Sequence, residues 1–363
     1  QNEIAHAITH ELTGRLLLAP NSGLPAKNKI NPDAYTAYLQ GRFFMAKRNK
    51  RDMEQAAEFF GKAIALAPNY VDAHASLART YALLFSNAQS RDMLPAARNE
   101  NAAALRLDPN NFQALVTKGL IADLSLHWTE AEGDLRGATV RNPRDADAQH
   151  FYALLLRELK LPNAAIAVER RALAIDPLSP VMRHSLGSFL HFLNLNAEAA
   201  AEFQAALALD ANFVLSLWGL CWSDALIGKL DEAKQMRSRL VVLNGEDGPF
   251  TDLCRILIAS RVGDLLELER LKSIAPNHYA TGDMPASYVG FMSALAGDMD
   301  LAMHWFQVAY RTQDSNLIYF LTDPGLPSKL QLDPRWRLFM QQSLMKQWQI
   351  ARERASVNFD AKK

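Results

Sequence analysis

The chain has 363 residues and equal numbers of basic and acidic side chains, 39 of each, so its formal net charge is zero. This balance argues against direct nucleic-acid binding, which needs a basic face that displaces counterions. No run of 18 apolar residues occurs, so we expect no membrane span. The two cysteines fit a reducing cytoplasm.

The first thirty residues differ from the rest of the chain. We expect a helix over residues 2–18 and then a loop rich in proline, glycine and asparagine. The chain starts at Gln1 rather than at a methionine, which suggests a fragment of a longer protein. His6 and His10 share a helical face, but no third ligand accompanies them, so we expect a polar face rather than a zinc site.

A regular period dominates the sequence that follows. Pro109, Pro143 and Pro177 are evenly spaced, and an alanine-rich amphipathic stretch precedes each of them. Their spacing matches the fixed period, about 34 residues, that is typical of stacked helical hairpins. The sequence therefore predicts an all-α fold, an α-solenoid of stacked antiparallel helix pairs.

Each period has the same types of residue at corresponding positions. A small residue such as Gly41 or Gly187 lies in the first helix, a large one such as Phe60 or Phe203 lies in the second, and a proline such as Pro68 ends the pair. Helices in a tight hairpin approach closely only where side chains are small, and proline ends a helix because it lacks an amide hydrogen. Six repeats begin near residues 31, 71, 112, 146, 180 and 283, with weaker ones near 214 and 249.

These features resemble the tetratricopeptide repeat over residues 31 to about 245, although Asn101 and Glu169 stand where a bulky residue is usual. The expected array of seven to eight repeats covers residues 31–313, and residues 314–363 form a closing helix and tail. Residues 1–45 resemble a junction in bacterial regulators, in which a TolB-like module precedes such an array. Residues 1–30 would then end an upstream module. A CadC-like winged helix or a nucleotide cyclase lies further upstream in those proteins.

The resemblance also implies a binding groove, because the second, fifth, ninth and twelfth positions of each repeat point into the concave face. Aromatic and arginine side chains are frequent in interface hot spots, and arginines can hold a peptide carboxylate. The alternatives are that the tryptophans pack the core and that the histidines only bond their neighbours. The candidate groove residues are Tyr35, Tyr38, Arg42, Arg79, Asp123, His150, Arg157, His184, His191, Trp218, Trp222 and Phe291.

No catalytic motif is present: the sequence has no glycine-rich phosphate loop, serine nucleophile elbow or zinc-protease motif. We therefore expect no enzyme activity, no cofactor and no metal. Cys221 and Cys254 are separated by nearly one period, and we expect two small buried residues at similar places in neighbouring repeats rather than a disulfide.

The predicted function is a protein- or peptide-binding scaffold in a larger bacterial signalling or transcription protein in the cytoplasm. The alternative is an intramolecular or self-association scaffold, a homo-oligomer included, that positions an absent winged-helix or cyclase output domain. The sequence leaves the two open.

Overall fold

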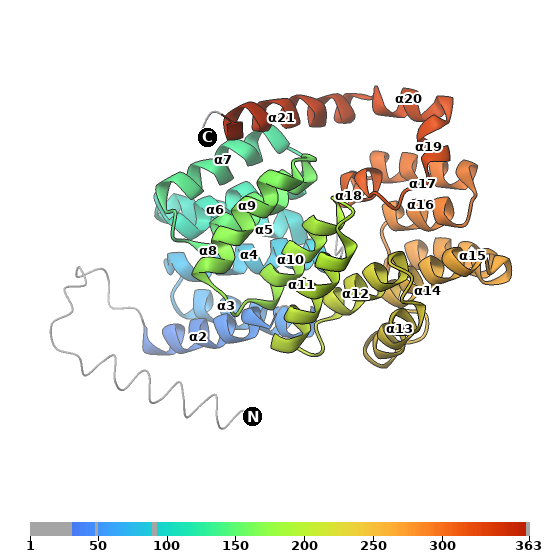
Figure 1. The fold of residues 1–363 in the computed structure, drawn as a ribbon. Helices are drawn as coiled ribbons and strands as arrows, with labels where there is room; N and C mark the ends of the chain where they lie inside the picture. The colour runs from blue at the N-terminus through green and yellow to red at the C-terminus, as the bar shows by residue number, and fades with distance from the viewer. Residues whose placement is uncertain (1–30, 48–49, 89–92, 361–363) are drawn as a thin grey trace. The chain divides into compact units, whose positions relative to one another are not determined.

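The computed structural model describes residues 31–47, 50–88 and 93–360, and these residues form helices joined by turns, with no strand among them (Figure 1). The predicted all-α fold of antiparallel helix pairs is confirmed. The helix expected over residues 2–18, with His6 and His10, lies outside the described residues. No helix of the described part is long and apolar enough to cross a membrane.

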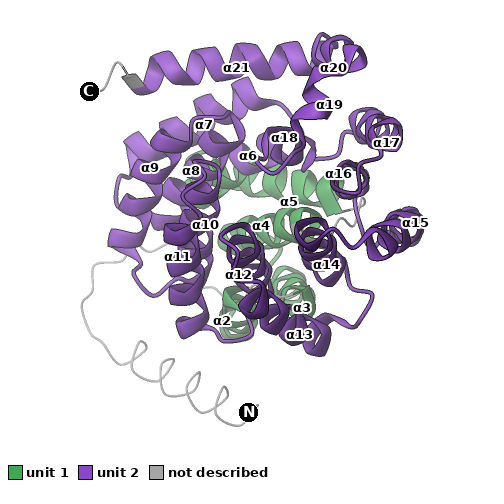
Figure 2. Cartoon of the chain, turned by 45° about the vertical axis from the view of Figure 1, so that its right-hand side comes forward, with its two compact units in different colours: residues 1–118 green, residues 119–363 purple. Residues whose placement is uncertain are grey.

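The chain divides into two compact units, residues 1–118 and residues 119–363, which Figure 2 colours separately. Unit 1 contains two helix pairs, and the boundary falls within the helix that follows them. These helices are α2 (Pro32–Ala46), α3 (Lys50–Leu66), α4 (Val71–Ala88), α5 (Met93–Leu107) and α6 (Phe112–Leu124).

Unit 2 continues with further pairs, in which each helix packs on the next one along the chain. The weaker repeats near 214 and 249 are also helix pairs. The helices are α7 (Trp128–Arg141), α8 (Ala146–Glu158), α9 (Pro162–Ile175), α10 (Pro180–His191), α11 (Asn196–Leu209), α12 (Val214–Leu226), α13 (Leu230–Asn244), α14 (Pro249–Val262), α15 (Leu265–Thr281), α16 (Ala286–Leu295) and α17 (Met299–Arg311).

The small residue of the first helix and the large residue of the second helix meet where the two helices of a pair cross, as predicted. A Cβ atom placed on Gly41 would lie 2.6 Å from the Phe60 ring, and one on Gly187 would lie 2.7 Å from the Phe203 ring. Both phenylalanines are buried. Each ring therefore fills the space that a side chain at the glycine would need, which holds the two helices close together.

The turns inside the pairs of unit 2 share one backbone conformation. Leu126, Lys160, Asn194 and Gly228 have φ values of 60°, 59°, 59° and 85°, and they recur at the period of the repeats. This left-handed region costs a side chain energy and costs glycine little. The hairpin geometry thus repeats even where the sequence supplies no glycine.

Four more helices follow α17: α18 (Leu317–Thr322), α19 (Ser328–Leu332), α20 (Pro334–Met340) and α21 (Ser343–Asp360). The last helix, α21, extends beyond α20 and packs against α7, near the start of unit 2 (Figure 1). The indole of Trp348 donates to the carbonyl of Glu158 at 3.0 Å, and the amide of Asn358 donates to Glu132 at 3.2 Å. The end of unit 2 is therefore tied to its beginning.

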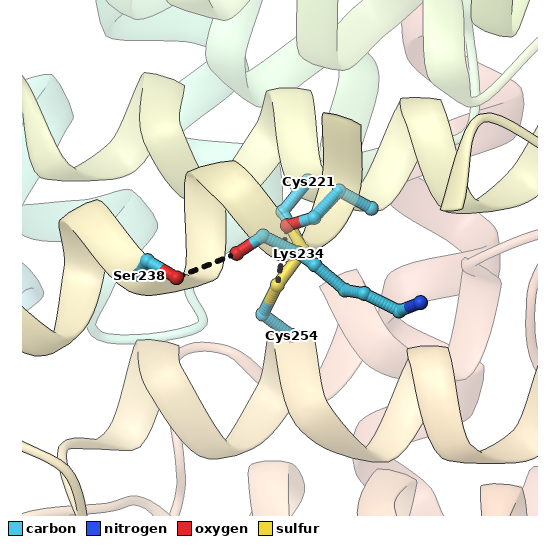
Figure 3. The surroundings of a disulfide bond; sticks show 5 residues. Cys221, Lys234, Ser238 and Cys254 are labelled. Carbon is cyan, nitrogen blue, oxygen red and sulfur yellow. Dashed lines mark hydrogen bonds between the residues drawn. A yellow bond between two sulfur atoms is a disulfide. The ribbon is translucent and has the colours of Figure 1, made fainter. Parts of the chain in front are cut away.

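The two cysteines form a disulfide, which corrects the expectation that they are unpaired. Both are fully buried, as expected. They lie on α12 and α14, the first helices of neighbouring repeats, which pack side by side (Figure 3). Their Cα atoms are 6.1 Å apart, within the range that a disulfide spans. Because such bonds are rare in a reducing cytoplasm, a cytoplasmic location stays a prediction.

Candidate functional site

All twelve candidate groove residues lie on the first helices of their pairs, and they divide between the two units. Four of them belong to unit 1, on α2 and α4, and eight belong to unit 2, on α6, α8, α10, α12 and α16.

In unit 1 the candidate residues form a small aromatic surface with an exposed arginine. The rings of Tyr35 and Tyr38 are 6.5 Å apart, and that of Tyr38 lies 5.0 Å from Tyr70. The guanidinium of Arg42 stands 6.0 Å from the Tyr38 ring, at the limit of a cation–π contact, and the Arg42 side chain is exposed. Arg79, by contrast, is buried. Arg42 is therefore the cation of this surface that a partner can reach.

In unit 2 the first helices bring aromatic side chains from distant repeats together. The rings of Trp218 and Trp222 are 5.9 Å apart, and Trp222 lies 5.6 Å from Phe291 on α16. His184, His191 and both tryptophans line one cavity. We call this surface the unit 2 groove, made by Arg157, His184, His191, Trp218, Trp222 and Phe291.

A segment of the same chain fills the unit 2 groove. Tyr319 on α18 lies under the guanidinium of Arg157, which is 4.5 Å from its ring centroid, and its ring is 5.1 Å from that of Phe192. Ser188 and Tyr319 line the same cavity. The cavity that remains has a volume of about 10 Å³, room for no more than a single water molecule.

The residue after α18 adds a buried ion pair to these contacts. Each ring nitrogen of His191 faces an oxygen: Nδ1 lies 2.8 Å from Asn196 Oδ1 and Nε2 lies 3.3 Å from Asp323 Oδ2. Burial would lower the pKa of His191, but the charge of Asp323 and the hydrogen bonds to Asp323 and Asn196 raise it on balance. The protonated ring donates to both oxygens, so the pair fixes the loop after α18 to α10.

The groove also contains polar donors that the described residues leave unmatched. The indole nitrogens of Trp218 and Trp222, the hydroxyl of Ser223 and the Nε and Nη1 atoms of Arg157 are buried without an acceptor in the described part of the chain. A buried donor without a partner costs roughly 1–3 kcal/mol. The groove therefore offers hydrogen bonds that its present occupant does not use.

Two candidate residues of unit 2 face neighbours other than the groove. His150 lies 2.8 Å from the buried carboxylate of Glu169 on the second helix of its own pair. This contact explains why an acid stands where a bulky residue is usual. Asp123 is buried, and the burial, together with the charge of Glu158, raises its pKa well above the usual range despite the nearby Arg157.

His184 lines the groove as a neutral ring. Its centroid lies 5.2 Å from that of Phe203 and 5.8 Å from that of Phe213. Burial lowers the pKa of His184 to about 3, with the charge of His150 adding to the effect. This histidine therefore lines the groove as an uncharged ring at ordinary pH, and its Nδ1 lies 3.3 Å from the Ser216 hydroxyl.

Sequence reasoning missed the occupant of the groove, residues 317–325. The sequence predicts only a closing helix and tail over residues 314–363. Residues 317–322 instead form the separate helix α18, and the Asp-Pro-Gly stretch after it forms a turn, in which the amide of Gly325 donates to Asp323. Only the aromatic pair Tyr319 and Phe320 signals more than a turn. Long-range contacts, such as that of Asp323 with His191, follow no sequence period.

A larger hollow lies elsewhere in unit 2, between α7, α9 and the end of α21, and has a volume of about 650 Å³. Three cations line it, Arg136, Lys160 and Arg171. Arg136 is already paired with Glu132 at 2.9 Å, and Lys160 and Arg171 are exposed. No three histidine, cysteine, aspartate or glutamate side chains of the described residues are placed to hold a metal ion.

Comparison with known proteins supports the repeat assignment. A family model described as a tetratricopeptide repeat matches residues 45–70. Over 182 residues the chain is 24% identical to the transcriptional regulator HilA of Salmonella typhimurium, and HilA of Salmonella typhi matches equally well. The match covers 49% of this chain and 32% of each relative, so it spans about a third of their length.

Solved structures of human IFIT1 show the same fold at low sequence identity. Human IFIT1, solved as a dimer with m7Gppp-AAAA, has a TM-score of 0.55 and 15% identity over 85% of this chain and 77% of its own. A tetratricopeptide repeat protein from Parabacteroides merdae has a TM-score of 0.48 and 17% identity over 70% of this chain and 99% of its own. The repeating helix pairs, their glycine–phenylalanine crossings and the matched repeat show that the chain has a tetratricopeptide-repeat fold.

Proposed function

We propose that the chain is a peptide-binding scaffold that acts within a larger bacterial signalling or transcription protein. The observation that carries this proposal is that the unit 2 groove already holds a short polypeptide segment. Tyr319 supplies an aromatic ring to Arg157 and Asp323 supplies a carboxylate to His191. These are the kinds of contact by which a groove recognises a peptide.

The unit 1 surface supports the same function with a different geometry. Tyr35 and Tyr38 are half-buried and Arg42 is exposed, so aromatic area and a cation are both accessible. Aromatic and arginine side chains give large contact area and polar handles. We propose two binding surfaces, one in each unit: Tyr35, Tyr38 and Arg42 in unit 1, and the unit 2 groove in unit 2. The other three candidates, Arg79, Asp123 and His150, are buried and take no part in them.

The regulatory context rests on the similarity to HilA, whose name describes a transcriptional regulator. The matched region covers only about a third of that protein, so its activity is not transferred to this chain. The alternative, a scaffold that only positions an output domain or self-associates, predicts that neither surface binds a separate peptide. Likewise, the expectation of no direct nucleic-acid binding stays a prediction, since the human IFIT1 chain was solved with a capped oligonucleotide.

The experiment is selection of peptides from a display library against the full chain, followed by calorimetry on purified variants. We expect selected peptides to lose at least tenfold in affinity on Arg42→Gln or on Arg157→Gln. An exposed arginine outside both surfaces, Arg311→Gln, serves as the matched control. Peptides that bind all three variants as tightly as the wild type would show that neither surface is the binding site.

A further inference from the structure

The occupant of the unit 2 groove has two chemically different faces. Leu317 and Phe320 are fully buried, and Phe320 packs on Tyr288 and Phe291 with centroid distances of 4.5 and 4.9 Å. Tyr319 and Asp323 instead contact Arg157 and His191. The first face belongs to the packing of α18 on α16, whereas the second makes side-chain contacts with α8 and α10.

The second face fits the groove incompletely. Trp218, Trp222 and Ser223 line the remaining cavity, and each keeps a buried donor without an acceptor in the described part of the chain. The cavity is nevertheless too small for a ligand while α18 is in place. Any peptide that uses these donors must therefore take the positions of Tyr319 and Asp323.

The segment is also short enough to be released. Helix α18 has six residues, and an isolated helix of that length is not stable in water. A left-handed residue, Gln313, precedes it, and the Asp323–Gly325 turn follows it. Its conformation thus depends on the surfaces it packs against.

We infer that residues 317–325 are an intramolecular ligand of the unit 2 groove, displaced by a partner peptide that presents an aromatic side chain and, four residues later, a carboxylate. This inference rests on the proposed function and specifies its partner. The aromatic ring replaces Tyr319 under Arg157, and the carboxylate replaces Asp323 beside His191. Main-chain carbonyl groups of an incoming peptide accept hydrogen bonds from the unmatched indole and hydroxyl donors.

The test uses a fluorescein-labelled synthetic peptide of residues 315–326 and the full chain. We expect weak binding to the wild type, because the internal segment competes. Binding to the Tyr319→Leu/Asp323→Asn double variant should be at least tenfold tighter, because its internal segment competes poorly. Thr322→Ala is the matched control, since the Thr322 hydroxyl bonds only to carbonyls of its own helix, and it should bind like the wild type.

A second measurement covers the case in which the double variant does not fold. Addition of the peptide to the wild-type chain should speed amide hydrogen exchange in residues 317–323, and a peptide with the tyrosine and aspartate replaced should not. Equal affinity for wild type and double variant, no binding to either, or full binding of the replaced peptide would overturn the inference. If the inference is overturned, library peptides that lose affinity on Arg42→Gln would still support the proposed function.

Discussion

Arg42 in unit 1 and Arg157 in unit 2 occupy the same position of their repeats but have different surroundings. Arg42 is exposed and stands over Tyr38 of its own helix, whereas Arg157 is covered by Tyr319 and Phe192. The repeat framework is the same in both units. A segment outside the repeat pattern therefore decides whether a binding position is open or filled.

The largest expected effect comes from the disulfide, which only unit 2 contains. Replacing both Cys221 and Cys254 with alanine should lower the unfolding free energy of unit 2 by about 3–4 kcal/mol, the value for a closed loop of this length. All six tryptophans lie beyond residue 118, so tryptophan fluorescence during urea unfolding reports on unit 2 alone. Amide exchange in residues 31–118 should stay unchanged.

Reductant provides the control for the disulfide prediction. Dithiothreitol should lower the urea midpoint of the wild type and leave the double-alanine variant where it is. If the wild type unfolds at the same urea concentration with and without reductant, and mass spectrometry finds free thiols, the bond does not contribute to unit 2.

A smaller effect is expected from the ion pair between His191 and Asp323. Asp323→Asn removes the charge but keeps the shape, and should cost unit 2 about 1.5–3 kcal/mol at pH 6, the range for a hydrogen bond to a charged group. The raised pKa of His191 means that the pair stabilises unit 2 fully below about pH 6.5. That contribution is lost as the pH rises through the raised pKa.

The pH dependence of the unfolding free energy should differ between the two units. The groups that face His191 are Asp323 after α18 and Asn196 on α11, so Asp323→Asn should flatten the fluorescence-detected pH profile above about pH 6.5. Unit 1 has its own pair, His74 with Glu100 at 2.6 Å, which the substitution leaves intact. Exposed His304→Gln in unit 2 is the matched control. A profile that keeps its slope in Asp323→Asn would mean that another group titrates.

The repeat framework could be predicted from the sequence because its determinants are local and periodic. Gly187 and Phe203 lie close together in the sequence and meet in one hairpin, and the periodic prolines, such as Pro143, follow directly after the end of a second helix. Even the degenerate pair α14–α15 keeps a left-handed turn at Gly263. Short-range spacing of this kind is enough to specify the pairs.

The filled groove and the disulfide could not be predicted in the same way. Trp348 reaches Glu158 across 190 residues, and Asp323 reaches His191 across 132. Such contacts depend on how far the helix pairs turn from one to the next, and no residue spacing encodes that turn. The cysteines were placed correctly in neighbouring repeats, but only the packing of α12 on α14 brings their sulfur atoms together.

Framework substitutions should affect the two units alike, in contrast to groove substitutions. Gly41→Ala in unit 1 and Gly187→Ala in unit 2 each place a Cβ within 2.7 Å of a buried phenylalanine ring. We expect each to cost about 1–3 kcal/mol through overpacking. Amide exchange in residues 31–118 measures the first and tryptophan fluorescence the second. Gly137→Ala, an exposed helical position with open space around it, should cost nothing.

The smallest expected effect concerns the left-handed turns. Lys160 is exposed and has a φ of 59°, so Lys160→Gly should stabilise unit 2 by about 1 kcal/mol by removing the strain of a side chain there. Gly228 has the equivalent position two repeats later and open space around it, so Gly228→Ala should cost about the same amount. Urea unfolding followed by tryptophan fluorescence measures both. Because neither residue belongs to a proposed binding surface, peptide binding should not change in either variant, and a change in affinity would mean that the turns also shape the groove.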